Sequence, residues 1–307
     1  MKKIFIALLV VLVAVVGGYY AFPEKVADYF VRYGRSQAGL VKKEILIDDH
    51  RIVYLEGGRG PAVLLLHGYS ADKDHWTRFA AGLTQHYHVV IPDIPGYGES
   101  TKRMNAKYDL SSQVGRLHRF ARALGLERIH IAGNSMGGLF AGAYAARYPG
   151  DLISLGLFNA AGVKSPRKSE VMIRAEQGEN LLLLKDEADL PRVMGMAFVN
   201  PPPLPYPFKK RFIEKALADR RFHEKALEDF KGDLLSLEKD LPKIKAPTLI
   251  LWGRNDRIID VSSVPVFERG LARHQTVIIE NCGHLPMIEK VGETSDAYLA
   301  FIGNVRR

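Results

Sequence analysis

The fold is decided by the stretch HIAGNSMGGLF, His130 to Phe140. A strand-like apolar run leads into Gly133-Asn134-Ser135-Met136-Gly137, and a helix-like segment rich in alanine follows. A serine on a sharp strand-to-helix turn needs small residues two positions before and after it, because larger side chains would clash with neighbouring backbone. The pattern predicts that Ser135 is a nucleophile, and the extra Gly138 favours this over a serine that only caps the helix. We expect the amide of Met136, at the helix start, to face the oxyanion of a tetrahedral intermediate.

A nucleophilic serine needs a base, and the base needs an orienting carboxylate, in the chain order acid and then histidine. Asp256 follows the strand-like TLILWG, and His284 follows the strand-like TVIIENCG. Loops at the carboxyl ends of parallel strands converge on one edge of a sheet. We therefore predict His284 as general base and then acid, with Asp256 fixing its tautomer. Asp260 is the competing acid, and Asp256 is favoured because it comes sooner after its strand.

A second oxyanion donor is expected in the loop after the strand-like AVLLL, where HGYSADKDHW (67–76) lies. His67-Gly68 permits a sharp turn, so that the amide of Tyr69 can face the nucleophile; the alternative is an ordinary glycine turn. The later loop DIPGYGES (93–100) is interpreted as architecture, and Asp93 is assigned no chemical role.

Short apolar runs alternate with helix-like segments, which predicts an α/β fold with a mostly parallel sheet of the eight-stranded type. Runs such as AVLLL are apolar without alternation, as expected of strands covered by helices on both faces. Residues 111–124 and 137–148 have the pattern of crossover helices. The strand-like runs are RIVYLEG, PAVLLLHG, YHVVIPDIPG, RIHIAGNS, LISLGLFNAAG, PTLILWGRND and QTVIIENCGH.

The alternation stops between Lys164 and Leu241, where charged helical segments surround the proline-dense NPPPLPYPF (200–208). This predicts a helical cap at 164–241, inserted into a core made of 41–163 and 242–307.

Composition excludes several classes of protein. With 47% hydrophobic and 25% charged residues in 307, the chain can bury a full core. The net charge of +9 is carried by scattered pairs without interleaved aromatic residues, so we expect no nucleic-acid partner. Cys282 is the single cysteine, which excludes an internal disulfide and a multi-cysteine zinc site, and we interpret it as a small buried filler. His86 and His88 lack a third ligand, so no metal is expected.

The amino terminus predicts a membrane anchor. Lys2 and Lys3, in a cytoplasmic segment 1–3, precede an uncharged run of 19 residues at 4–22, about the length that crosses a bilayer. The run ends in Tyr19, Tyr20 and Phe22 without an A-x-A cleavage site, which favours a retained anchor over a cleaved signal peptide that would leave a periplasmic or secreted protein. We expect the catalytic domain to be exported to the periplasmic side of a bacterial inner membrane. The juxtamembrane segment 23–40 could lie on the membrane or pack on the domain.

Residues 41–307 resemble the α/β-hydrolase superfamily, and within it the membrane-anchored monoacylglycerol lipases and the related lipases of cold-living bacteria. The motifs that carry this resemblance are HGYSADKDHW, IPDIPGYGES, GNSMGG, WGRNDRIID and ENCGH. The resemblance implies that Ser135, Asp256 and His284 are the nucleophile, acid and base, and that Tyr69 and Met136 supply the oxyanion amides. It also implies that the anchor is retained.

We therefore expect a serine hydrolase of carboxylic esters, with monoacylglycerols or other acyl esters of lipids as substrates and no cofactor or obligate protein partner. The cap residues Leu181 to Leu184, Met194, Met196 and Phe198 would either line an acyl pocket or pack on the core. Carbon-carbon bond hydrolases of aromatic degradation share GNSMGG, but they usually carry H-G-x-G-P-G where this chain has HGYSADKD.

Proline-type aminopeptidases and haloperoxidase-like enzymes of the same fold remain alternatives. A binding protein of this fold typically lacks a triad member, and none is missing here. Haloalkane dehalogenases and epoxide hydrolases use an aspartate where this chain has Ser135.

Overall fold

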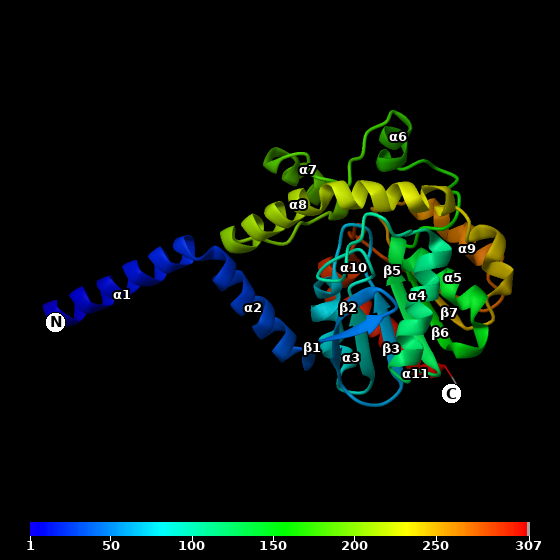
Figure 1. Ribbon diagram of the computed structural model, residues 1–307, viewed down its shortest axis with the longest axis horizontal. Helices are drawn as coiled ribbons and strands as arrows, with labels where there is room; N and C mark the ends of the chain where they lie inside the picture. The colour runs from blue at the N-terminus through cyan, green and yellow to red at the C-terminus, as the bar shows by residue number, and fades with distance from the viewer. Residues whose placement is uncertain (306–307) are drawn as a thin grey trace.

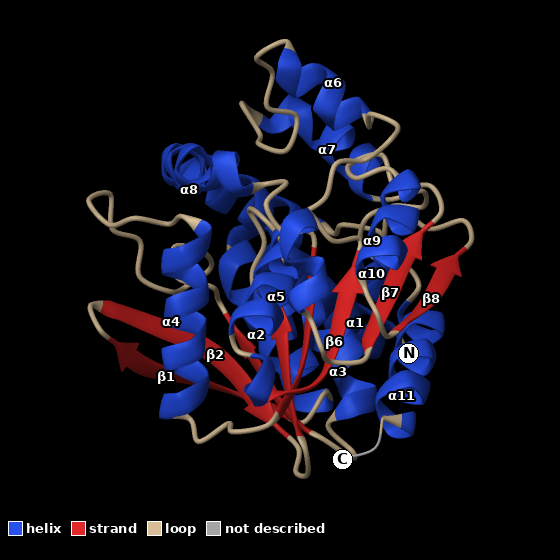
Figure 2. Cartoon of the chain, turned by 90° about the vertical axis from the view of Figure 1, so that its right-hand side faces the viewer, coloured by secondary structure: helices blue, strands red, loops and turns tan. Residues whose placement is uncertain are grey.

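Eight strands form one sheet, and helices cover both of its faces (Figures 1 and 2). The computed structural model describes residues 1–305. The strands are β1 (Leu40–Ile47), β2 (His50–Gly57), β3 (Ala62–Leu66), β4 (His88–Pro92), β5 (Ile129–Asn134), β6 (Leu152–Phe158), β7 (Thr248–Gly253) and β8 (His274–Ile279). Their order is β1-β2-β4-β3-β5-β6-β7-β8. β2 is antiparallel to β1 and β4, and all other neighbours are parallel, so the predicted sheet is confirmed.

The helices divide between the two faces of the sheet. One face is covered by α4 (Leu110–Ala123), α5 (Met136–Arg147) and α9 (Val264–Gly270), and the other by α3 (Thr77–Leu83), α10 (Pro286–Glu289) and α11 (Val291–Asn304). The two predicted crossover helices correspond to α4 and α5, each displaced by one residue. All residues of β5, β6 and β7 are buried, which explains why these strands read as continuous apolar runs.

The edge strand β1 was not among the predicted strands. Only its end residues, Leu40 and Ile47, are buried, and Val41 to Leu46 lie at the surface or only half-buried. Two lysines and a glutamate interrupt its apolar pattern, because one side of an edge strand faces water and charged residues there discourage pairing with other chains.

Three helices lie between β6 and β7, in the segment predicted as a cap: α6 (Glu170–Glu176), α7 (Leu190–Ala197) and α8 (Tyr206–Phe230). They lie over the end of the sheet toward which the arrows of β7 and β8 point (Figure 2). Leu184, Leu190 and Ile213 form a small apolar cluster of their own, so part of the cap packs on itself. The cap thus covers the edge of the sheet at which parallel strands present their following loops.

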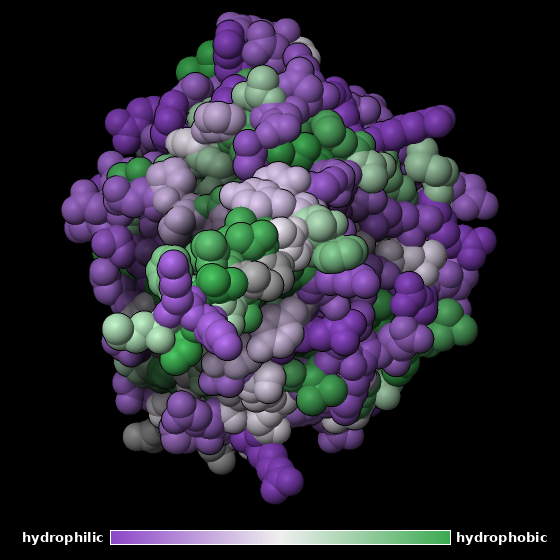
Figure 3. Space-filling view, turned by 90° about the vertical axis from the view of Figure 1, so that its left-hand side faces the viewer, coloured by the Kyte–Doolittle hydropathy of each residue, from purple (hydrophilic) through white to green (hydrophobic). Residues whose placement is uncertain are grey.

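The amino-terminal helix α1 (Lys2–Ala21) projects away from the body of the molecule (Figure 1). It is long and apolar enough to cross a membrane, by length and composition alone, and its apolar window is 0% buried. Seen end-on, its apolar side chains stand against a largely hydrophilic face (Figure 3). A signal sequence would have the same properties.

The next helix, α2 (Pro23–Gln37), belongs to the folded body. Ala27 and Arg35 are buried, and the ring of Phe30 lies 6.4 Å from that of Phe208 at the start of α8. Of the two alternatives for the juxtamembrane segment, its inner face therefore packs on the domain, while Tyr29 and Tyr33 remain exposed.

Candidate active site

Ser135 lies on a strained turn between β5 and α5. Its backbone has φ 57° and ψ −120°, a combination that non-glycine residues rarely adopt and that persists only where the surrounding structure enforces it. The amide of Ser135 donates to the carbonyl of Phe158 at 3.1 Å, and its carbonyl accepts from Leu139 at 3.1 Å and Ala161 at 3.0 Å. These bonds hold the serine at the end of β5.

The glycines around Ser135 make this turn possible. A Cβ atom on Gly133 would lie 2.1 Å from the carbonyl oxygen of Gly137, and one on Gly137 would lie 2.3 Å from that of Leu66. Both contacts are with backbone, which cannot move aside. The predicted steric need for small residues two positions before and after the serine is confirmed.

The side chains of His284 and Asp256 meet in the structure, although they lie on different loops. His284 Nδ1 lies 2.8 Å from Asp256 Oδ2, and both residues are about 95% buried. Asp256 Oδ1 accepts from the amides of Ile258 at 2.7 Å and Ile259 at 3.0 Å, so both carboxylate oxygens are held. The contact places a proton on Nδ1 and leaves the Nε2 lone pair available.

The competing acid, Asp260, does not contact His284. It caps a short 3₁₀ helix by accepting from the amide of Ser262 at 2.9 Å and pairs with exposed Arg167. These contacts show that the carboxylate of Asp260 stabilises a turn.

The loop of Ser135 is joined to that of His284 by Asn134. Its Nδ2 donates to the carbonyl oxygens of His284 at 3.0 Å and Phe158 at 3.1 Å. The loop of His284 is held from its other side by the cap, because its amide donates to the carbonyl of Ala197 at 2.8 Å. The structure therefore pairs the side chains of His284 and Asp256, and it joins the loop of His284 to the residue before Ser135 on one side and to the end of α7 on the other.

Sequence reasoning missed Asn159, which immediately follows β6. Its Nδ2 donates to Asp256 Oδ2 at 2.6 Å, and its Oδ1 accepts from the amide of Gly253 at 3.3 Å. Its φ of 46° is one that asparagine tolerates better than most residues. A lone asparagine after a strand carries no distinctive pattern, and only the strand order places it beside the acid loop.

We expect Asn159→Gly to lower kcat about tenfold, because the acid loses a bond that fixes its position. Glycine keeps the left-handed backbone, so the change isolates the amide group. The control is Asn281→Gly, since Asn281 has a similar φ of 50° but is exposed. Steady-state ester hydrolysis measures both variants, and equal activities would show that Asn159 does not position the acid.

The loop from His67 to Trp76 passes next to Ser135. A Cβ atom on Gly68 would lie 3.2 Å from Ser135 Cβ. His67 Nδ1 donates to the carbonyl of Gly68 at 2.8 Å, and its Nε2 accepts from the amide of Ile94 at 3.0 Å. Burial lowers the pKa of His67 to about 3, so the ring stays neutral and fixes the turn.

Tyr69 follows this turn. Its hydroxyl donates to the carbonyl of His223, on α8, at 2.8 Å, which joins the loop to the cap. Within residues 1–305, the amides of Tyr69 and Met136 donate no hydrogen bond to another part of the chain. Two free donors beside the serine are what an oxyanion site requires.

Cys282 is fully buried, as the filler interpretation predicts, and burial raises the pKa of its thiol to about 12. His88, one of the two histidines considered as metal ligands, contacts a carboxylate: its Nε2 lies 2.7 Å from Glu56 Oε1.

A groove of about 680 Å³ lies beside the acid loop. Cap residues Phe198, Val199 and Pro201 line one part of it, and Asp256 and Arg257 line another. The apolar residues Leu181, Leu183 and Leu184 are buried and do not line this groove, and Leu184 packs in the apolar cluster of the cap.

Comparison with known proteins gives consistent results. The model of the alpha/beta hydrolase family matches residues 63–297. The chain is 37% identical to Lipase 1 of Psychrobacter immobilis over 88% of this chain and 87% of that protein. It is 27% identical to a monoacylglycerol lipase of Homo sapiens over 96% of this chain and 91% of that protein. A crystal structure of a membrane phospholipase A, described as a bacterial virulence factor, is similar over 100% of both chains, with a TM-score of 0.92 and 44% identity.

Proposed function

The chain belongs to the alpha/beta hydrolase family, and from that premise we propose that it is a serine hydrolase that cleaves acyl esters of lipids through an acyl-enzyme on Ser135. The observation that carries the proposal is the strained turn of Ser135 in the same region as the buried pair of His284 and Asp256. Relatives named lipase or monoacylglycerol lipase support lipid esters as the substrate class.

The first half of the reaction forms the acyl-enzyme. His284 Nε2 takes the proton of Ser135 Oγ as Oγ attacks the ester carbonyl carbon. The carbonyl oxygen becomes an oxyanion, which the amides of Tyr69 and Met136 stabilise. Asp256 stabilises the imidazolium of His284. The intermediate collapses when the C–O bond to the alcohol breaks and His284 returns the proton to the leaving alcohol oxygen.

The second half releases the acid. Water attacks the acyl carbon while His284 accepts its proton, and the second tetrahedral intermediate expels Ser135 Oγ, which recovers the proton. The products are one alcohol and one fatty acid, and the cycle uses no cofactor.

The substrate would enter under a cap that comprises residues 164–241. The groove beside Asp256 has the apolar cap side chains of Phe198 and Val199 on one part, which would contact an acyl chain, and charged residues such as Arg254 and Arg257 on another, which would face a polar head group.

The proposal is tested with a fluorophosphonate probe and a substrate series. We expect the probe to label Ser135, as located by peptide mass, and to block hydrolysis of monoacylglycerols, lysophospholipids and phospholipids of graded chain length. A protein that leaves every acyl ester untouched and cleaves a vinylogous diketone would be a carbon-carbon bond hydrolase instead.

We further propose that α1 is a retained anchor in a bacterial inner membrane, with residues 23–307 on the periplasmic side. Lys2 and Lys3 before the apolar run support a cytoplasmic amino terminus. The proposal keeps the predicted division into anchor (4–22), juxtamembrane segment (23–40), core (41–163 and 242–307) and cap (164–241).

We expect the full chain to stay with membranes after carbonate washing, and protease added to spheroplasts to digest the catalytic domain. An inner-membrane protein with a cytoplasmic domain is the control for spheroplast integrity. Soluble periplasmic protein that lacks residues 1–22 would identify α1 as a cleaved signal peptide.

A further inference from the structure

We propose that Arg35, on the juxtamembrane helix α2, is a positioning residue for the reaction: it holds the loop that presents the oxyanion amide of Tyr69. The inference rests on the proposed function. It gives α2, the helix that follows the anchor, a role in positioning the catalytic machinery.

Arg35 contacts this loop through a bidentate ion pair with Asp74. Its Nε lies 2.8 Å from Asp74 Oδ1, and its Nη2 lies 2.7 Å from Asp74 Oδ2. The side chain of Arg35 is 11% exposed and that of Asp74 is 27% exposed. Two parallel charged hydrogen bonds in a partly buried setting fix both distance and orientation.

Asp74 is linked to Tyr69 through the loop itself. The amide of Asp74 donates to Asp72 Oδ1 at 3.0 Å, and Asp72 Oδ2 accepts from Lys215, on α8, at 2.6 Å. On the way to Tyr69, the amide of Ala71 donates to the carbonyl of Gly68 at 3.3 Å, and Ser70 has a φ of 57°. Asp74 lies in a short 3₁₀ helix, Lys73–Trp76, which Asp72 caps, so the bonds that Asp72 and Asp74 make with Lys215 and Arg35 hold the end of the loop that begins at His67.

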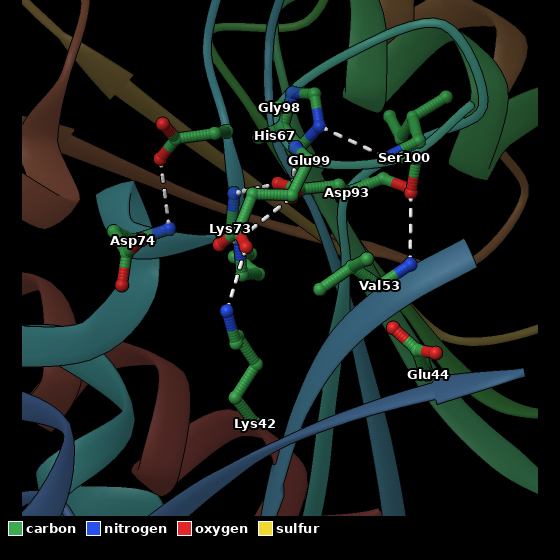
Figure 4. Close-up of polar contacts among 12 residues, drawn as sticks. Lys42, Glu44, Val53, His67, Lys73, Asp74, Asp93, Gly98, Glu99 and Ser100 are labelled. Atoms are coloured by element: carbon green, nitrogen blue, oxygen red, sulfur yellow. Dashed lines mark hydrogen bonds and ion pairs between the residues drawn. The ribbon is translucent and has the colours of Figure 1, made fainter. Parts of the chain in front are cut away.

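A second cluster of charges holds the same loop from the sheet (Figure 4). Fully buried Asp93 accepts from the amide of Lys73 at 2.8 Å and from its Nζ at 2.7 Å. Lys73 Nζ also donates to Glu99 at 2.8 Å, and Glu99 pairs with Lys42 of β1 at 2.6 Å. Asp93, which the sequence interpreted as architecture, thus helps to hold the oxyanion loop.

The balance of charge explains why Arg35 matters. Four carboxylates lie along or beside this loop, those of Asp72, Asp74, Asp93 and Glu99, and their cationic partners are Lys42, Lys73, Lys215 and Arg35. Arg35 is the cation that bonds to Asp74, and its Nη2 also lies 3.7 Å from Glu99 Oε1. Without Arg35, Asp74 would lose both of its charged hydrogen bonds and keep only the hydroxyl of Thr77, at 3.4 Å, as a side-chain donor, which favours displacement of the loop. A displaced amide at Tyr69 weakens transition-state binding more than substrate binding.

The location of Arg35 indicates that this positioning role is separate from the features that the whole family shares. It lies outside residues 63–297, the part of the chain that the family model matches. Glu24, at the other end of α2, pairs with Arg211 of α8 at 2.9 Å, so α2 is held against the cap as well as against the loop.

The test uses the full-length protein in detergent. We expect Arg35→Ala to lower kcat about tenfold with KM changed less than about twofold, because a catalytic group is misplaced and binding is kept. Asp74→Ala should have the same effect, the double variant should be no worse than either single one, and Arg35→Lys should recover part of the loss. The affinity for a trifluoromethyl ketone, which forms a tetrahedral oxyanion on the serine, should weaken by the same factor as kcat.

Arg32→Ala is the matched control and should leave kcat unchanged. Arg32 lies on the same helix and forms an ion pair with Asp28, but its side chain is 76% exposed. If Arg35→Ala does not fold, Arg35→Lys and Asp74→Asn decide the question in the same way. The inference is overturned if these variants lose thermal stability but keep kcat and inhibitor affinity, while Ser135→Ala is inactive. Full activity of Ser135→Ala would instead overturn the proposed function.

Discussion

Replacing Ser135 with alanine should lower kcat for monoacylglycerol hydrolysis about a hundred-thousandfold or more, because the variant cannot form the acyl-enzyme. What remains would come from substrate binding and the oxyanion amides. Alanine is smaller than serine, so it fits the same tight turn, although the positive φ stays unfavourable. The measurement is initial-rate hydrolysis by purified full-length protein, with active sites counted by fluorophosphonate labelling of the wild type.

The control for this experiment is Ser111→Ala, on the exposed start of α4, which should keep both labelling and activity. Thermal unfolding of Ser135→Ala verifies that the loss is chemical. If folded Ser135→Ala retained more than about a tenth of the activity, the nucleophile would have to be another group.

Replacing Asp256 with asparagine should lower kcat about ten-thousandfold. An asparagine presents its amide to His284 without the negative charge that stabilises the imidazolium, and it can hold the ring in the wrong tautomer. Its similar shape keeps the bonds from Ile258 and Ile259 possible, so the fold should survive. The measurement is again kcat, with KM determined in parallel.

Asp260→Asn is the matched control, because this aspartate was the competing acid in the same loop. It caps a short helix and pairs with Arg167, and asparagine also caps helices well. Its activity should stay within about threefold of the wild type, because its half-buried carboxylate bonds to Ser262 and Arg167 and not to His284. A large loss in Asp260→Asn together with an active Asp256→Asn would reassign the acid.

Local sequence patterns predicted the sheet because most strands are buried on both faces and must be apolar throughout. The same patterns missed β1, since Lys42, Lys43 and Glu44 break its apolar run at the exposed edge. The sequence pattern also left the role of the cap leucines open, because leucines that line a pocket and leucines that pack together look the same in a sequence. In the structure, Leu184 packs with Leu190 and Ile213.

The residues expected to carry the chemistry were found from short patterns. Gly133 and Gly137 mark the turn of Ser135 because their absent side chains make room for backbone, a local requirement visible in the sequence. Chain order then singled out Asp256 and His284 as candidates, since strand ends in such a sheet share one edge.

Asn159 and Arg35 are different, because their partners lie far away along the chain. Asn159 meets Asp256 at a separation of 97 residues, and Arg35 meets Asp74 at a separation of 39.

By itself, the sequence determined the α/β sheet, the serine turn and the order of its candidate partners, because each depends on residues close together or on strand periodicity. Only the tertiary structure decided which aspartate contacts His284, that the side-chain amide of Asn159 bonds to this aspartate, and that α2 contacts the loop beside Ser135. Hydrogen bonds and ion pairs act over about 3 Å in space, whatever the separation along the chain, and folding alone sets those distances.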